Sequence, residues 1–167
     1  MCVTNFNELD QQIYAGFAFT RGIVGIAGTT VWKDESFGFF ARRHPPYALG
    51  PVLEGAPSQE DFLGSFNLWC DGLNATLVLT EIADTGLIGT LRENRDITLP
   101  VTAAIDPRGP HIAKITVHGT RWDTAPTMFL YMFVRQRTAL AGWLEWGTTQ
   151  LGCYLTRFRS ARAIASP

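Results

Sequence analysis

A few polar side chains within apolar segments are the residues of this chain best suited to chemistry. Tyr131 lies between Phe129 and Phe133 at two-residue spacing, and Glu145 follows Trp143 at the same spacing. Side chains two residues apart share one face of a β-strand. If these faces point into a closed fold, they line a pocket for a largely apolar ligand with one polar end. The expected ligand-binding residues of this pocket are Phe129, Tyr131, Phe133, Trp143, Glu145 and, on the last apolar segment, Tyr154.

Glu145 and Tyr131 are the candidate catalytic residues of such a pocket. A buried carboxyl group has a raised pKa, so Glu145, between Trp143 and Trp146, could donate a hydrogen bond or act as a general acid. Tyr131 would be another of the few polar groups there. The alternative is that Glu145 is an exposed carboxylate paired with a neighbouring arginine, because alternation alone does not fix which face is inside.

Motifs for cofactor or metal chemistry are absent from the sequence. It contains no glycine-rich phosphate loop, no paired-histidine metal signature and no nucleophile elbow. His44, His111 and His118 are isolated from one another. We therefore expect no cofactor and no metal.

The three cysteines, Cys2, Cys70 and Cys153, have no metal-finger spacing. A sparse, odd set is typical of reduced thiols in a cytosolic protein. One bridge stays open, because Cys70 and Cys153 fall in predicted strands that could be neighbours. Residues 1–10 show no secretory signal, so we expect cytoplasmic localisation.

The composition favours a folded domain and argues against two classes of partner. Apolar residues make up 46% of the chain and charged residues 17%, which is enough apolar material for a core. The net charge is −1 and no basic run exceeds Arg42–Arg43, so no nucleic acid partner is expected. No apolar stretch approaches the roughly 20 residues of a membrane-spanning helix, so no membrane partner is expected.

Residues 64–160 divide into short β-like segments separated by clusters of Gly, Asn, Asp and Pro. Tight loops of this kind join antiparallel neighbours, and a meander of eight strands avoids exposed edges by closing on itself. The sequence therefore predicts an all-β fold, an up-and-down antiparallel β-barrel of about eight strands with an N-terminal extension. The predicted strands are Ser65–Cys70, Ala75–Ile82, Leu87–Arg92, Ile97–Ile105, Ile112–His118, Thr127–Arg135, Leu140–Trp146 and Leu151–Arg159.

Residues 1–63 are predicted to be an extension of extra strands, a lid or a strap, and residues 161–167 a tail. A short helix is expected over Asn7–Gln12 and a helical turn over Ser58–Asp61, with a proline-rich linker or lid at 44–51. The predicted strands of this part are Ile13–Thr20, Ile23–Trp32 and Phe37–Arg43.

Thr127–Arg135 is apolar on both faces, although an antiparallel strand with one wet face should alternate. This indicates a second buried surface outside the barrel. It is either a subunit interface, which makes a homo-oligomer the expected assembly, or a surface covered by the N-terminal residues.

Residues 64–160 resemble the avidin- and streptavidin-like barrels of the calycin type. The resemblance rests on Gly64 ahead of Trp69, on residues 69–74 (WCDGLN) and on residues 84–90 (DTGLIGT). It implies a ligand-binding barrel in which Asp71 stands at a ureido-contacting position and Trp143 at a stacking position, with Trp69 near the site. Ala75 stands where the family has a hydroxyl and Leu91 where it has a tyrosine, so the resemblance implies the barrel and leaves biotin itself in doubt.

Three functions are compatible with these observations. The first is a binding module that holds a small apolar ligand. The second is a cofactor-free enzyme resembling calycin-like cyclases and Diels–Alderases of secondary metabolism, in which shape, orientation and a few hydrogen bonds do the catalysis. The third is a structural barrel whose two apolar faces drive oligomerisation.

Overall fold

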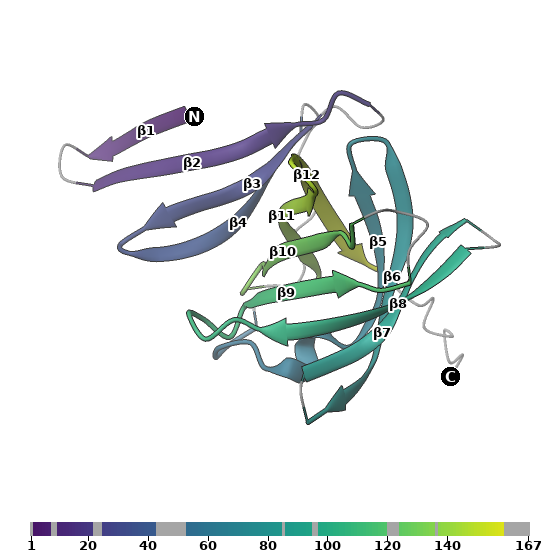
Figure 1. Cartoon of the computed structure of the whole chain (residues 1–167). Coiled ribbons are helices and arrows are strands. Elements are labelled where there is room, and N and C mark those ends of the chain that lie inside the picture. Colours follow the sequence, from purple (N-terminus) through teal and green to yellow (C-terminus); the bar gives the residue numbers. More distant parts are fainter. Residues whose placement is uncertain are drawn as a thin grey trace, which may run out of the picture.

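Eight consecutive antiparallel strands close into a barrel, and four N-terminal strands form a separate sheet beside it (Figure 1). The computed structural model describes residues 2–7, 10–21, 25–42, 53–84, 86–94, 97–119, 124–135 and 137–158. Around the barrel the order is β10-β11-β12-β5-β6-β7-β8-β9, so the last strand pairs with the first. The barrel strands are β5 (Gly64–Cys70), β6 (Leu73–Ala83), β7 (Gly86–Asn94), β8 (Ile97–Ile105), β9 (Ile112–Val117), β10 (Thr127–Met132), β11 (Ala139–Trp146) and β12 (Thr149–Arg157).

The predicted all-β barrel and its eight strands are confirmed, with ends that differ by a few residues. Turn chemistry explains this agreement. In the β5–β6 hairpin Asp71 and Gly72 have φ angles of 41° and 94°, a left-handed pair that makes the tightest hairpin turn and suits Asp-Gly. The largest difference at one end of a barrel strand is at β10, which was predicted to end at Arg135. It ends at Met132, because residues 133–135 turn towards β11.

The N-terminal strands are β1 (Cys2–Asn7), β2 (Asp10–Ala18), β3 (Gly25–Trp32) and β4 (Glu35–Arg42), paired in that order. The expected helix over Asn7–Gln12 is wrong, because Asn7 ends β1 and Asp10 begins β2. Their pairing runs from Cys2 opposite Tyr14 to Asn7 opposite Asp10, so strand partners satisfy the backbone that a helix would have used. The predicted lid at 44–51 lies outside the described residues.

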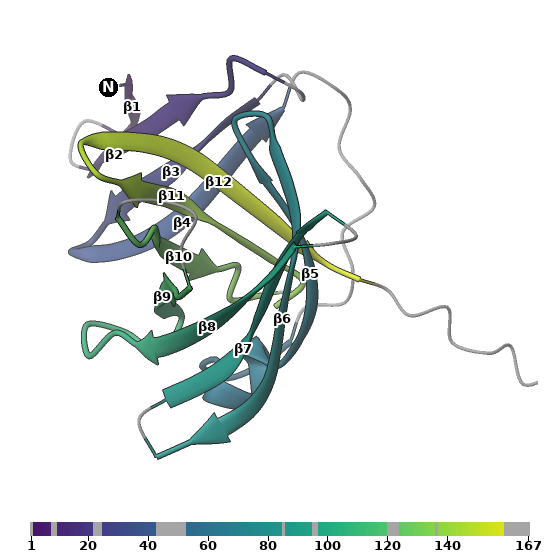
Figure 2. The ribbon, with the colours of Figure 1, turned by 45° about the vertical axis from the view of Figure 1, so that its right-hand side comes forward.

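This sheet packs on the outer face of β10, β11 and β12 (Figure 2). Gly38 of β4 lies so close to the barrel that a Cβ there would come within 2.8 Å of the Tyr131 Cβ and 2.7 Å of the Ala141 carbonyl oxygen. Phe40 of β4 stacks on Tyr154 of β12, with ring centroids 3.8 Å apart. The second apolar face of these strands is thus covered by the chain's own N-terminal sheet.

A one-turn 3-10 helix, η1 (Gln59–Phe62), closes one end of the barrel. Phe62 of this turn is 0% exposed and belongs to the core. Arg157, at the end of β12, donates to the carbonyl oxygens of Leu63, at 2.5 Å, and of Asp61, and its guanidinium lies 4.7 Å from the centroid of the Phe66 ring. The helical turn expected at Ser58–Asp61 is therefore confirmed, and it acts as the floor of the barrel.

The barrel interior is mainly aliphatic, which corrects the expected aromatic lining. On β10 the core residues are Met128, Leu130 and Met132, so Phe129 and Tyr131 point to the outer face. The physical reason is that both faces of this strand are apolar, and the larger aromatic rings fill the contact with the N-terminal sheet. The interior residues across the barrel include Leu68, Leu77, Leu91, Val101, Ile115, Leu130, Leu144 and Leu155.

Among the described residues, no helix has the length and apolarity needed to cross a membrane.

Candidate functional site

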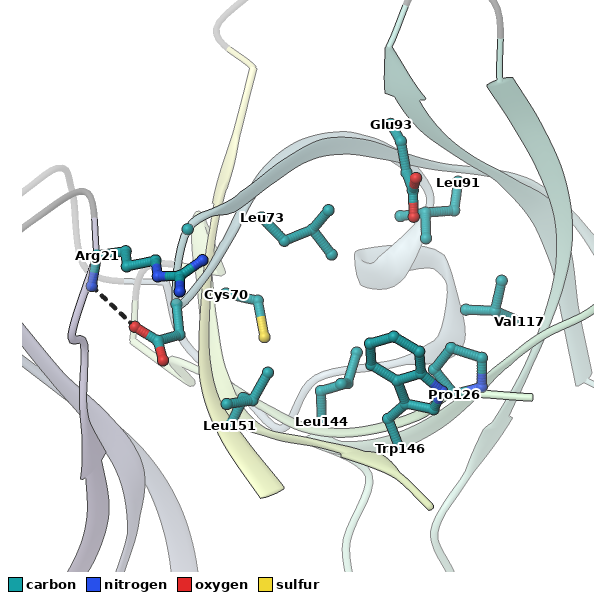
Figure 3. Close-up of a pocket in the computed structure, with 12 residues that line it drawn as sticks. Arg21, Cys70, Leu73, Leu91, Glu93, Val117, Pro126, Leu144, Trp146 and Leu151 are labelled. Atoms are coloured by element: carbon teal, nitrogen blue, oxygen red, sulfur yellow. Dashed lines mark hydrogen bonds between the residues drawn. The ribbon is translucent and has the colours of Figure 1, made fainter. Parts of the chain in front are cut away.

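The end of the barrel opposite η1 is open and forms a pocket of about 350 Å³ (Figure 3). The pocket lies where β5, β7, β9 and β11 end and where β6, β10 and β12 begin. Its wall is mostly aliphatic, with a thiol, a carboxylate and an indole among the apolar side chains. The lining residues inside the barrel are Cys70, Leu73, Leu91, Glu93, Val117, Pro126, Leu144, Trp146 and Leu151.

Glu93 is the charged side chain on the inner wall of this pocket. It is 7% exposed, although glutamate is among the residue types least often buried. Its position follows from strand alternation, because Leu87, Leu91 and Glu93 are all separated by even numbers of residues and share the inner face of β7. In Figure 3 its carboxylate points into the ring of strands beside Leu91.

The sequence pattern did not point to Glu93, because the predicted strand ended at Arg92 and Glu93 lay just beyond it. The structure continues β7 to Asn94. The two-residue spacing from Leu87 and Leu91 was the signal that could have found it.

Trp146 and Arg21 lie at the rim of the pocket. Trp146 is 40% exposed and ends β11, so its indole borders both the pocket and solvent. Arg21 comes from the segment between β2 and β3, which brings the N-terminal sheet to the barrel mouth at this one side. The pocket therefore combines an aliphatic floor with an aromatic and a cationic rim.

Asp71 connects the rim to the N-terminal segment. Its carboxylate accepts hydrogen bonds from the Thr20 hydroxyl at 2.9 Å and from the Arg21 backbone N–H at 2.9 Å, the latter drawn in Figure 3. Burial raises the pKa of Asp71, but the hydrogen bonds from Thr20 and Arg21 outweigh it and hold the pKa below its ordinary value. Of the predicted ligand-binding residues, Asp71 is the one that lines the mouth pocket. Its carboxylate is held by Thr20 and Arg21, and we call this contact the tether between the barrel and the N-terminal segment.

The predicted aromatic residues do come together, but on the outer face of the barrel. Phe129 stacks on Trp143 with centroids 5.2 Å apart, and Tyr131 lies 6.1 Å from Trp143. Burial raises the pKa of Tyr131 above its ordinary value. These three rings form one half of an aromatic layer.

The other half of the layer surrounds Tyr154. Trp69 lies 6.0 Å from the Tyr154 ring and Phe133 lies 6.5 Å from it, while Phe40 covers it. Trp69 and Tyr154 are also opposite one another in the β5–β12 pairing. The layer is thus built mainly from rings of the barrel, and Phe40 of the N-terminal sheet stacks on it. None of its rings lines the mouth pocket.

Glu145 lies near the end of β11, outside the interior. It accepts hydrogen bonds from the Trp143 indole N–H at 3.1 Å and from the Gln150 side chain at 3.0 Å. It is thus a half-buried surface carboxylate, as one of the two alternatives proposed, but its partners are an indole and an amide in place of an arginine. Its predicted role as a general acid stays a prediction.

The histidines have structural partners. A ring nitrogen of His111 lies 2.6 Å from the Ser36 carbonyl oxygen, and one of His118 lies 2.7 Å from the Thr102 hydroxyl. His44 lies outside the described residues. In the part of the chain that the structure describes, no three histidine, cysteine, aspartate or glutamate side chains are grouped so as to hold a metal ion.

A second pocket, of about 440 Å³, lies between the β3–β4 hairpin and the β8–β9 loop. Its lining includes Phe37, Arg108 and His111, and Phe37 stacks on His111 with centroids 5.6 Å apart. It is a gap beside the docked sheet, outside the barrel, and its histidine is engaged with the cover. The mouth pocket is therefore the better candidate for ligand binding.

The chain matches no family model, and comparison with curated proteins and with solved structures gives no significant similarity to either. The closed eight-stranded antiparallel barrel is consistent with an avidin-like fold.

Proposed function

We propose that this protein binds a small, largely apolar molecule in the mouth pocket of the barrel, with a cationic or hydrogen-bond-donating end of that molecule at Glu93. The observation that supports this is a carboxylate on the inner wall of a pocket that is otherwise mainly aliphatic. Both oxygens of a carboxylate accept hydrogen bonds, so a ligand group that donates one matches it. Its attraction to a cation is also stronger in such surroundings than in water.

The size and rim of the pocket narrow the class of ligand. A volume of about 350 Å³ is near the lower end of the range for small-molecule sites, which is about 300–1,000 Å³. The Trp146 indole lies at the entrance, and indole rings attract cations. A short alkyl or aryl amine has the required combination of apolar body and charged end.

A matched series of nonylamine, nonanol and nonanoate tests this proposal by isothermal titration calorimetry. We expect nonylamine to bind at least ten times more tightly than nonanol, and nonanoate to bind most weakly. The Glu93→Gln variant should bind nonylamine and nonanol about equally, because the charge is removed while the shape is kept. Glu81→Gln, which removes an exposed carboxylate on β6, should keep the wild-type order.

The outcomes separate two parts of the proposal. Absence of heat with all three compounds would refute ligand binding in the pocket. An amine preference that survives in Glu93→Gln would refute the assignment of Glu93 as the selecting group.

Biotin is not the ligand that this proposal favours. Its ureido group would require contacts near Asp71, whose carboxylate accepts from Thr20 and Arg21. Ala75 and Leu91 offer no hydroxyl to a ureido oxygen, and an unpaired buried polar group costs about 1–3 kcal/mol. Titration with biotin should give no heat of binding.

A further inference from the structure

Cys70 and Cys153 face each other across the strand pair that closes the barrel. Their Sγ atoms are 2.9 Å apart, and the two residues are 83 positions apart in the chain. Tyr154 is opposite Trp69 in the register, so Cys153 and Cys70 are the next opposed positions. Directly opposed residues of antiparallel strands have Cα atoms about 4.5–5.5 Å apart, within the roughly 4.4–6.8 Å that a disulfide spans. A bond between them requires no exchange of strand neighbours.

The cysteines lie where the closure of the barrel ends. The paired register of β5 and β12 runs from Phe66 opposite Arg157 to Trp69 opposite Tyr154. Immediately beyond it, towards the mouth pocket, come the two thiols. A covalent bond there would fasten the seam at its last position, beside the ligand pocket.

The two thiols differ in their access to small molecules. Cys70 is 1% exposed but lines the mouth pocket. Cys153 is 0% exposed and is not among the described residues that line the pocket. Burial, and after it the neighbouring Cys70 thiol, raise the pKa of Cys153 well above its ordinary value. A reagent that enters the pocket therefore meets Cys70 first, and Cys153 can react only through Cys70.

We propose that Cys70 and Cys153 form a reversible disulfide bond by exchange with low-molecular-weight disulfides that enter through the mouth pocket. The Cys70 thiolate attacks one sulfur of the small disulfide, forms a mixed disulfide and releases one small thiol. The Cys153 sulfur then attacks the Cys70 sulfur, loses its proton and releases the second small thiol. The two protein thiols are oxidised to one disulfide, and the small disulfide is reduced to two thiols that carry the two protons. This reaction is independent of the proposed ligand and fastens the barrel seam.

The experiment treats the folded protein, in a Cys2→Ser background, with hydroxyethyl disulfide at mildly alkaline pH. Intact mass should fall by two hydrogens, and peptide mapping should find Cys70 linked to Cys153. A bond that closes so long a loop should raise Tm by roughly 5–10 °C, and dithiothreitol should reverse both changes. Oxidation that leaves Tm unchanged or lower would refute the clamp on the seam.

Two single variants identify the order of reaction. Cys153→Ala should stop at a mixed disulfide on Cys70, and Cys70→Ala should leave Cys153 unmodified while the protein is folded. Retention of both free thiols, a lasting mixed disulfide in the parent protein, or a disulfide-linked dimer would each overturn the proposal. Because no ligand is present, these outcomes do not depend on whether the pocket binds amines.

Discussion

Replacing Arg157 with methionine should weaken the closed end of the barrel. Methionine keeps an unbranched apolar stem of similar reach, so the substitution removes mainly the guanidinium group. That group donates to the carbonyl oxygens of Leu63 and Asp61 and covers the Phe66 ring. The perturbation therefore separates the polar contacts of the floor from its hydrophobic packing.

The expected loss follows from these three contacts. A hydrogen bond from a charged donor contributes about 1.5–3 kcal/mol, and a cation–π contact about 0.5–2 kcal/mol. Arg157 is only half-buried, so water replaces part of what is lost and the lower ends of these ranges apply. We expect the free energy of unfolding to fall by about 3 kcal/mol, which corresponds to a Tm lower by roughly 6–12 °C for a domain of this size.

Urea unfolding followed by tryptophan fluorescence and circular dichroism measures this change. Arg157→Lys keeps the charge but not the forked geometry, and it should recover part of the loss. Arg92→Met, on the exposed face of β7, is the matched control and should leave the midpoint unchanged. A loss below about 1 kcal/mol for Arg157→Met would show that Phe62 packing and the Arg137–Asp61 ion pair hold η1 without Arg157, and it would refute the role assigned to the guanidinium.

Three further predictions concern the N-terminal sheet and its tether at Asp71. Gly38→Leu should detach β4 from the barrel, because a Cβ there comes within 3 Å of backbone atoms of Ala141 and Tyr131. Increased binding of a hydrophobic dye would report the exposed aromatic layer, and unchanged dye binding would contradict the close approach. Phe40→Ala should cost about 2–3 kcal/mol of unfolding free energy in thermal melts, since it removes the ring stacked on Tyr154. The pKa of Asp71 is lowered in the folded state, so its stabilisation should be present above the ordinary aspartate pKa near 4 and be lost as pH falls through the lowered value. The difference in unfolding free energy between wild type and Asp71→Asn should therefore shrink at acidic pH. A difference that stays constant with pH would contradict this prediction.

The order of strands could be predicted from the sequence because it depends on local chemistry. Asp71-Gly72 and the other turn clusters break the apolar segments at short intervals, and tight turns leave antiparallel pairing of successive strands as the simplest arrangement. Closure follows from the same logic, since eight strands otherwise leave two long edges exposed. These inferences use residues that are close in the chain.

The orientation of the strands could not be predicted in this way. On β10 both Met128-Leu130-Met132 and Phe129-Tyr131 are apolar, so alternation offers two equivalent solutions. The choice depends on the N-terminal sheet, whose Gly38 lies against Tyr131 of β10 although the two residues are about 90 positions apart in the chain. The predicted site residues on the aromatic face therefore lie on the outer side of the barrel. Glu93 was overlooked because the predicted strand ended at Arg92, two residues before the end of β7.

The N-terminal sheet precedes in the chain the strands whose outer face it covers. During synthesis β1–β4 emerge before β10–β12, which follow only after a further hundred or so residues, an interval on the order of 10 s at ribosomal rates. For that interval the apolar face of the nascent N-terminal sheet has no native partner. Its hairpins can form locally, but they must not associate with other chains before the barrel is complete. The yield of folded protein should therefore depend on translation speed and on chaperones that shield sheet faces.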